Sequence, residues 1–224
     1  MAARRASSTE APPSTTPSMN LVAPSFLRRA LTEAVNGSFN QMTVDGDTST
    51  NDSCFLLANG QSGAPLLVGE GSEAARFAAA LEVVCSDLAR KMAADGEGAS
   101  KLLTVDVTGA ASEADARAAA RAVAGSSLVK AAVHGEDPNW GRVFAALGNS
   151  GARVDSARAA LWIGEVQVAR GGIGTGVSKD EARAQMRGAE VVLRVDLGVG
   201  NAAARGWGCD LTEAYVVENS AYST

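Results

Sequence analysis

The 224-residue sequence is poor in the residues that several common functional sites need. It has a single histidine, His134, which excludes a metal site built from several histidines. Its three cysteines lie far apart and form no Cys-x-x-Cys pair, which indicates free thiols in a reducing compartment. Aromatic residues make up only 4%, too few for the stacking platforms of proteins that bind single-stranded nucleic acid.

Charge and hydropathy exclude two further classes of partner. The chain has 20 Lys and Arg against 25 Asp and Glu, and a net charge of −5 argues against a nucleic-acid-binding face, which must be basic. No apolar run approaches the roughly 18 residues that a membrane-spanning helix requires. Hydrophobic residues reach 46%, enough for a core, so we expect a globular protein with no nucleic-acid or membrane partner.

The chain divides into a short first segment and one long domain. Residues 1–24 are rich in Ser, Thr and Pro without hydrophobic periodicity, so we expect them to be disordered or foreign to the domain, which spans 25–224. Apolar residues at helical spacing predict helices over 25–35, 72–94, 112–124, 140–147 and 178–187. Alternating and β-branched runs predict strands at 42–44, 54–58, 102–108, 129–133 and 190–197, and a hairpin over 161–170. This alternation is typical of a mixed α/β (α+β) domain.

Three motifs imitate known sites. Gly198–Ala203 matches the dinucleotide-binding pattern, but the 21 residues after it are too few for the required βαβ unit. Asp45–Asp52 resembles the start of a calcium loop, but Thr50 and Leu56 stand where that loop needs Gly and Glu. This segment is therefore either a tight polar turn or the floor of a pocket. His134 could act as a base near pH 7, but no Gly-x-Ser-x-Gly nucleophile accompanies it, and a structural role is the alternative.

Three other stretches, taken together, resemble one enzyme family. They are TVDGDTSTND at 43–52, DPNWGR at 137–142, and a tail that begins WGCDLT at 207 and ends NSAYST at 224. In order and spacing they are similar to the β-chain of the bifunctional ornithine acetyltransferase, or glutamate N-acetyltransferase, of arginine biosynthesis. The resemblance covers residues 22–224. It implies a layered αββα sandwich of the type shared with N-terminal-nucleophile aminopeptidases.

The resemblance also implies a reaction and a partner. Such proteins are made as one precursor that cuts itself before a threonine, and the α and β chains then assemble as a heterotetramer. The freed threonine carries acetyl from N2-acetylornithine to glutamate by covalent catalysis, with the oxyanion hole in the α chain. No metal or nucleotide cofactor is implied, although acetyl-CoA is a co-substrate for some members. The implied compartment is the cytoplasm in bacteria, with chloroplast or mitochondrion as the alternative.

The family's substrate contacts correspond to three residues of this chain. Glu97 lies in the turn DGEGA at 95–99, and its carboxylate would suit the substrate's amino group. Asn219 can both donate and accept hydrogen bonds, as an amino-acid substrate requires, and the final Thr224 completes the set. The alternatives are a solvated turn at Glu97 and a frayed chain end at Asn219 and Thr224.

The chain departs from the family at the nucleophile. The family's cleavage motif, which ends Ala-Thr-Met-Leu, does not occur in the sequence, and its slot falls at about Ala11. Thr9 is near but has unrelated neighbours, so we assign no catalytic residue. We expect an acetyltransferase subunit that is inactive as an isolated chain. The alternatives are a non-catalytic scaffold paralogue that binds an α-chain-like partner and, third, a related N-terminal-nucleophile peptidase.

Overall fold

The computed structural model describes residues 21–61 and 63–221, and a six-stranded sheet organises them. The strand order is β4-β3-β2-β5-β1-β6, with β1 parallel to β5 and the other neighbours antiparallel. The strands are β1 (Leu102–Ala110), β2 (Ala160–Ile163), β3 (Val166–Arg170), β4 (Ile173–Gly174), β5 (Glu190–Asp196) and β6 (Ala202–Cys209). The mixed α/β class expected from the sequence is therefore confirmed, and the described residues contribute one sheet to it.

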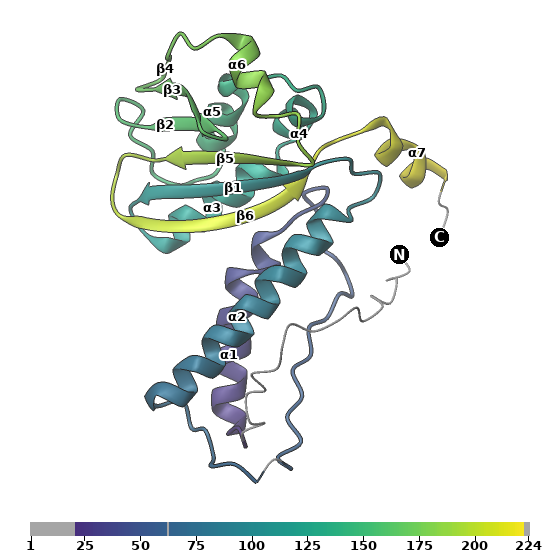
Figure 1. Ribbon diagram of the computed structural model, residues 1–224, viewed down its shortest axis with the longest axis vertical. Helices are drawn as coiled ribbons and strands as arrows, with labels where there is room; N and C mark the ends of the chain where they lie inside the picture. The colour runs from purple at the N-terminus through teal and green to yellow at the C-terminus, as the bar shows by residue number, and fades with distance from the viewer. Residues whose placement is uncertain (1–20, 62, 222–224) are drawn as a thin grey trace.

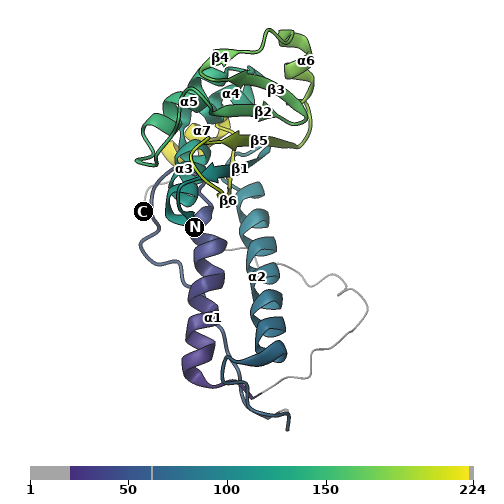
Figure 2. The same ribbon diagram turned by 90° about the vertical axis from the view of Figure 1, so that its left-hand side faces the viewer.

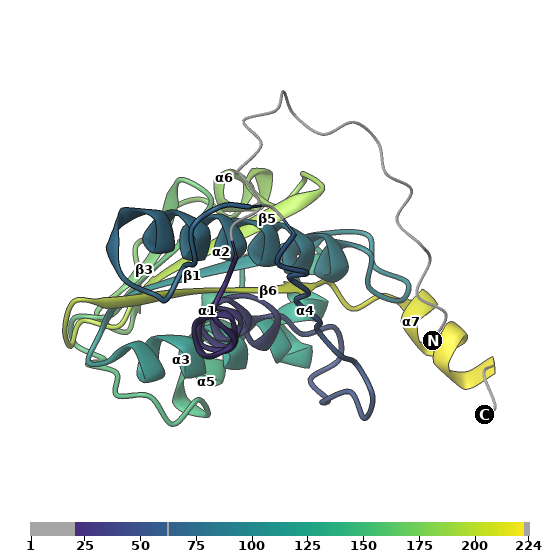
Figure 3. The ribbon, with the colours of Figure 1, turned by 90° about the horizontal axis from the view of Figure 1, so that it is seen from below.

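The main core lies between this sheet and the helices on one of its faces. Figure 3 shows α3 (Glu113–Gly125) and α5 (Trp140–Gly148) side by side beneath the strands. Ser112 caps α3, because its hydroxyl accepts a hydrogen bond from the Asp115 amide. The alternate residues of β1 and β5 that face these helices are fully buried, among them Val105, Leu193 and Val195. The hairpin β2–β3 and the short α6 (Lys179–Ala184) complete this part.

Two long helices form a parallel pair at the β6 edge of the sheet. Figures 1 and 2 show α1 (Pro24–Gly37) and α2 (Gly71–Ala94) side by side, and both run toward the strands. A short 3-10 helix, η1 (Phe39–Gln41), follows α1. At the sheet end of the pair, Ala89 and Ala93 of α2 are buried against Leu102 and Trp207 of the sheet. The helix pair therefore joins the sheet at the end where β1 starts and β6 finishes.

Three local predictions were wrong or incomplete. Residues 129–133 belong to a helix, α4 (Ser127–His134), because Val129 and Val133 are four residues apart and bury the same helical face. The helix α2 begins at Gly71, one residue earlier than expected, and Glu70 occupies the capping position. The strand β6 was not predicted, because its glycines and alanines give little β-strand signal.

Residues 54–58 form no strand either, although their sequence, CFLLA, is typical of one. No described strand pairs with them, and the side chains of Phe55 and Leu57 are 82% and 90% exposed. Near them, the expected strand at 42–44 is reduced to one bridge between Met42 and Trp207. An apolar segment needs a neighbouring strand before its backbone can be satisfied as a sheet, and the described residues supply none here.

Candidate functional site

Two of the three residues selected as substrate contacts lie together. Glu97 is in the turn that follows α2, and Asn219 lies on α7 (Glu213–Ala221), a helix that stands apart from those covering the sheet (Figure 1). Asn219 Nδ2 donates to Glu97 Oε2 at 2.8 Å and to the Tyr215 carbonyl at 3.0 Å. Asn219 is exposed to solvent and Glu97 is half-buried. The third residue, Thr224, lies outside the described residues, as do Ala11 and Thr9 at the expected slot of the nucleophile.

Acidic side chains surround the tyrosine of α7. Burial raises the pKa of the Tyr215 hydroxyl, and the carboxylates of Asp45, Glu97 and Asp47 raise it further because they disfavour a phenolate. The polar segment Asp45–Asp52 therefore begins beside Glu97. A cluster of carboxylates with a neutral phenol suits a ligand that carries an ammonium group.

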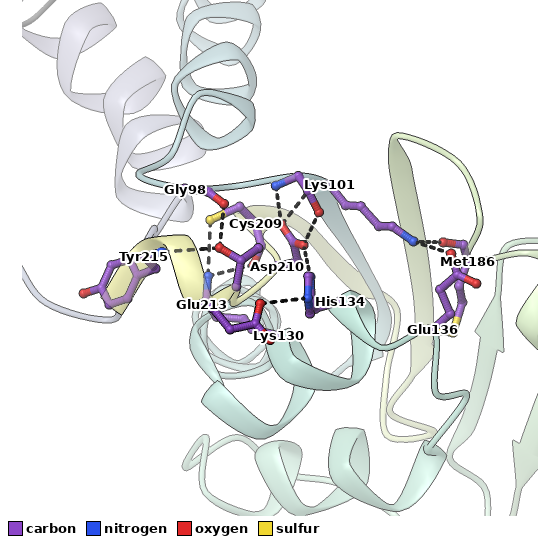
Figure 4. A network of polar contacts seen from close by, with 12 residues as sticks. Gly98, Lys101, Lys130, His134, Glu136, Met186, Cys209, Asp210, Glu213 and Tyr215 are labelled. Carbon is purple, nitrogen blue, oxygen red and sulfur yellow. Dashed lines mark hydrogen bonds and ion pairs between the residues drawn. The ribbon is translucent and has the colours of Figure 1, made fainter. Parts of the chain in front are cut away.

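Asp210, directly after β6, binds the loop that carries Glu97. Its side chain is fully buried and accepts hydrogen bonds from the Ser100 amide at 2.8 Å, the Lys101 amide at 2.9 Å and the Ser100 hydroxyl at 2.5 Å. His134 Nδ1 lies 3.0 Å from the same carboxylate, and His134 Nε2 lies 3.5 Å from Glu213 (Figure 4). Burial alone would raise the pKa of Asp210, but these hydrogen bonds outweigh it and hold the pKa below the ordinary value.

Thr212 makes a second connection between the same loop and α7. Its hydroxyl donates to the Gly98 carbonyl at 2.7 Å and accepts from the Tyr215 amide at 3.3 Å in the first turn of the helix. Gly98 has a positive φ of 64°, and a Cβ at this position would lie 2.5 Å from the Tyr215 nitrogen. The backbone of the loop and the start of α7 are therefore in direct contact.

A buried lysine closes the other side of this region. Lys130 of α4 is 2% exposed, and its ammonium donates to the Val44 carbonyl at 2.6 Å and to the Cys209 carbonyl at 2.7 Å. It also lies 3.3 Å from the sulfur of Cys209, whose pKa is raised by burial despite this cation. Lys130 thus ties the start of the Asp45–Asp52 segment to the end of β6.

A hollow of about 820 Å³ lies elsewhere among the described residues. It separates the helices α1 and α2 from the open sheet face, where Arg205 Nη2 donates to Asp106 at 2.9 Å. Neither Glu97 nor Asn219 lines it. We base the candidate site on the Glu97–Asn219 contact instead, since Arg205 is already paired. No group of three or more His, Cys, Asp or Glu in the described parts of the chain could hold a metal ion.

Sequence reasoning missed Asp210, Thr212 and Lys130. Asp210 and Thr212 lie in WGCDLT, one of the stretches that carry the family resemblance, and this was the available signal. Lys130 offered none, because a lysine in an apolar run appears as a solvated position until the fold buries it. His134 points to Asp210 and Glu213 and extends the same network.

The mixed α/β fold and the contact between Glu97 and Asn219 define the class of protein. Comparisons with known proteins identify the family. The sequence model of the ArgJ family matches residues 19–224, and the chain belongs to this family. It is 48% identical over 203 residues to the "Arginine biosynthesis bifunctional protein ArgJ" of Dehalococcoides mccartyi, covering 91% of this chain and 50% of that protein. It is 50% identical over 207 residues to the "Glutamate N-acetyltransferase" of Methanopyrus kandleri, covering 90% and 52%.

A solved structure agrees with this assignment. The crystal structure of the arginine biosynthesis bifunctional protein ArgJ from Bacillus halodurans superposes with a TM-score of 0.87 at 41% identity. The match covers 91% of this chain and 96% of the crystallised chain. By contrast, the present chain spans about half the length of the curated relatives it matches. No described helix is long and apolar enough to cross a membrane.

Proposed function

We propose that this chain is the substrate-holding half of an acetyltransferase of arginine biosynthesis. In the reaction, acetyl moves from N2-acetylornithine to glutamate, and acetyl-CoA serves as an alternative donor. No metal or organic cofactor takes part in the proposed route. The observation that carries the proposal is the contact between Glu97 and Asn219, which are 122 residues apart in sequence and meet at 2.8 Å.

The chemistry of these two groups suits an amino-acid substrate. Glu97 supplies a carboxylate for the substrate's ammonium group, with Asp45 and Asp47 nearby to strengthen the negative potential. The Asn219 amide offers a donor to a carboxylate and an acceptor to an amide N–H. Asn219 is exposed and Glu97 is half-buried, so a ligand can reach the pair and replace the hydrogen bond between them.

The partner in this proposal is the half of the family protein that this chain does not match. The exposed apolar side chains of 54–58 and of α2 support such a partner, because an isolated chain would leave them in water. They are Phe55, Leu57, Val83, Val84, Leu88 and Met92. We expect the isolated chain to self-associate and the assembly with the missing half to be monodisperse. We propose a cytoplasmic location, as the bacterial relatives favour it over an organelle.

A binding experiment tests the proposed site. The chain is co-expressed with the unmatched half of the Dehalococcoides mccartyi protein, and binding of N2-acetylornithine to the assembly is measured by calorimetry. Glu97→Gln removes the charge that faces the ammonium group, and we expect roughly ten- to hundredfold weaker binding. Glu165→Gln is the control, because it makes the same change of charge at an exposed residue that pairs with Arg194 at the hairpin end of the sheet. Equal affinity of the wild type and Glu97→Gln would contradict the proposed site.

Turnover distinguishes the enzyme from the second candidate, a non-catalytic scaffold. The sequence lacks the family's nucleophile motif, and this favours binding without turnover by the chain alone. We therefore expect no acetyl transfer between acetylornithine and glutamate by the purified chain. Transfer by the isolated chain would contradict this expectation, while substrate binding without transfer in the assembly would favour the scaffold.

A further inference from the structure

The Glu97–Asn219 pair has little packing of its own. Asn219 is exposed and Glu97 is only half-buried, and α7, which carries Asn219, buries none of its nine residues. A helix of this length is not stable in isolation, and most helical stability in proteins comes from packing of one face. The position of α7 relative to the Glu97 turn therefore depends on the contacts where the helix begins.

We propose that Asp210 and Thr212 are the positioning residues of this pair, an inference that deepens the proposed function and rests on it for the role of Glu97 and Asn219. Both lie in the three-residue connection between β6 and α7. Asp210 binds the two amides that end the Glu97 turn, those of Ser100 and Lys101. Thr212 binds the Gly98 carbonyl, adjacent to Glu97.

The two side chains hold the turn at its two ends. The Thr212 hydroxyl accepts from the Tyr215 amide while it donates to Gly98, so one oxygen connects the helix start to the turn. The buried Asp210 carboxylate fixes the far end of the turn against the end of β6, and the hydrogen bonds to its charged oxygens are of the strong, charge-assisted kind. Figure 4 shows Gly98, Asp210 and Tyr215 close together beside His134 and Lys130.

The fold does not depend on these contacts. The strand β6 pairs with β1 through a ladder from Leu102–Cys209 to Ala110–Ala202, which ends before Asp210. The main core lies between the sheet and α3 and α5. Loss of the Asp210 or Thr212 side chain should therefore loosen the turn and α7 while the sheet and its core remain.

Hydrogen–deuterium exchange on the full chain tests the proposal without any ligand. We expect Thr212→Val and Asp210→Asn to speed exchange in both 98–101 and 213–221 by about tenfold, with no change in β1 or β5. Thr212→Ser keeps the hydroxyl and should restore wild-type exchange. The matched control is Asp106→Asn, which removes a sheet carboxylate bound to Arg205 far from the turn and should leave both segments unchanged.

The outcomes separate this inference from the proposed function. Unchanged exchange in Thr212→Val and Asp210→Asn would overturn the inference, as would wild-type α7 amides that exchange as fast as those of an unfolded peptide. In the co-expressed assembly, Thr212→Val should weaken binding of N2-acetylornithine about tenfold and Thr212→Ser should not. A third outcome is faster exchange in Thr212→Val and Asp210→Asn together with wild-type binding of N2-acetylornithine by Glu97→Gln. This result would show that the pair is positioned but is not the substrate site, and it would contradict the proposed function alone.

Discussion

Replacement of the buried Lys130 by methionine should destabilise the chain measurably. Lys130 forms no ion pair with a carboxylate among the described residues, and two backbone carbonyls, of Val44 and Cys209, accept its short hydrogen bonds. Methionine has a similar length but no donor, so the buried Cys209 carbonyl and the partly buried Val44 carbonyl both lose a short hydrogen bond, and Val44 keeps only a 3.9 Å contact with the Cys209 sulfur. Each unpaired buried group costs about 1–3 kcal/mol, partly offset because a buried ammonium no longer has to be desolvated.

The net loss for Lys130→Met is therefore about 3 kcal/mol, which for a chain of this size lowers Tm by about 6–12 °C. Circular dichroism melts at neutral pH measure the difference. The control is Lys179→Met, because Lys179 is 73% exposed and only 3.5 Å from Asp137 in an exposed pair. A Tm for Lys130→Met within about 2 °C of both the wild type and this control would refute the reasoning.

Three further predictions concern acid, thiols and the core. The pKa of Asp210 lies below its ordinary value of 3.8, so the ionised Asp210 stabilises the folded chain fully above about pH 4, and this stabilisation is lost as the pH falls through the lower folded-state pKa. The Tm of the wild type should therefore fall more on acidification below about pH 4 than the Tm of Asp210→Asn. Equal falls of the two Tm values would contradict this. A maleimide should label the exposed Cys54 quickly and reach Cys85 and Cys209 only after unfolding, because burial shields the thiols of Cys85 and Cys209 and raises their pKa. Rapid labelling of all three cysteines in the native chain would be inconsistent with the fold. Leu161→Ala should lose about 2–5 kcal/mol of unfolding free energy in urea, since Leu161 is fully buried, and a loss below about 1 kcal/mol would contradict its place in the core.

Long periodic segments were predictable from the sequence. The helices α2 and α3 and the strands β1 and β5 each carry enough apolar residues at one spacing to identify the element before any partner is known. The short α4 was mistaken for a strand, because β-branched valines favour strands until packing places them on one face of a helix. Within α2, the small Ala89 and Ala93 are buried whereas Leu88 is not, a choice that depends on the neighbouring sheet.

The candidate site was also only partly predictable from the sequence. Glu97 and Asn219 were selected from motifs, and their contact across 122 residues became visible only in the structure. Nothing in the sequence distinguishes Lys130 from a solvated lysine, since burial is a property of the surrounding elements. The sequence also could not show that residues 54–58 form no strand, because an apolar run becomes a strand only when another strand lies beside it.

By itself, the sequence of this ArgJ-family chain determined its class and its longest elements, and its motifs selected Glu97 and Asn219 as candidate contacts, since composition, periodicity and motifs are local properties. Only the tertiary structure decided that Asp210, Thr212 and Lys130 gather at the end of β6, because the meeting of β6 with the start of β1 and α4 brings distant side chains together.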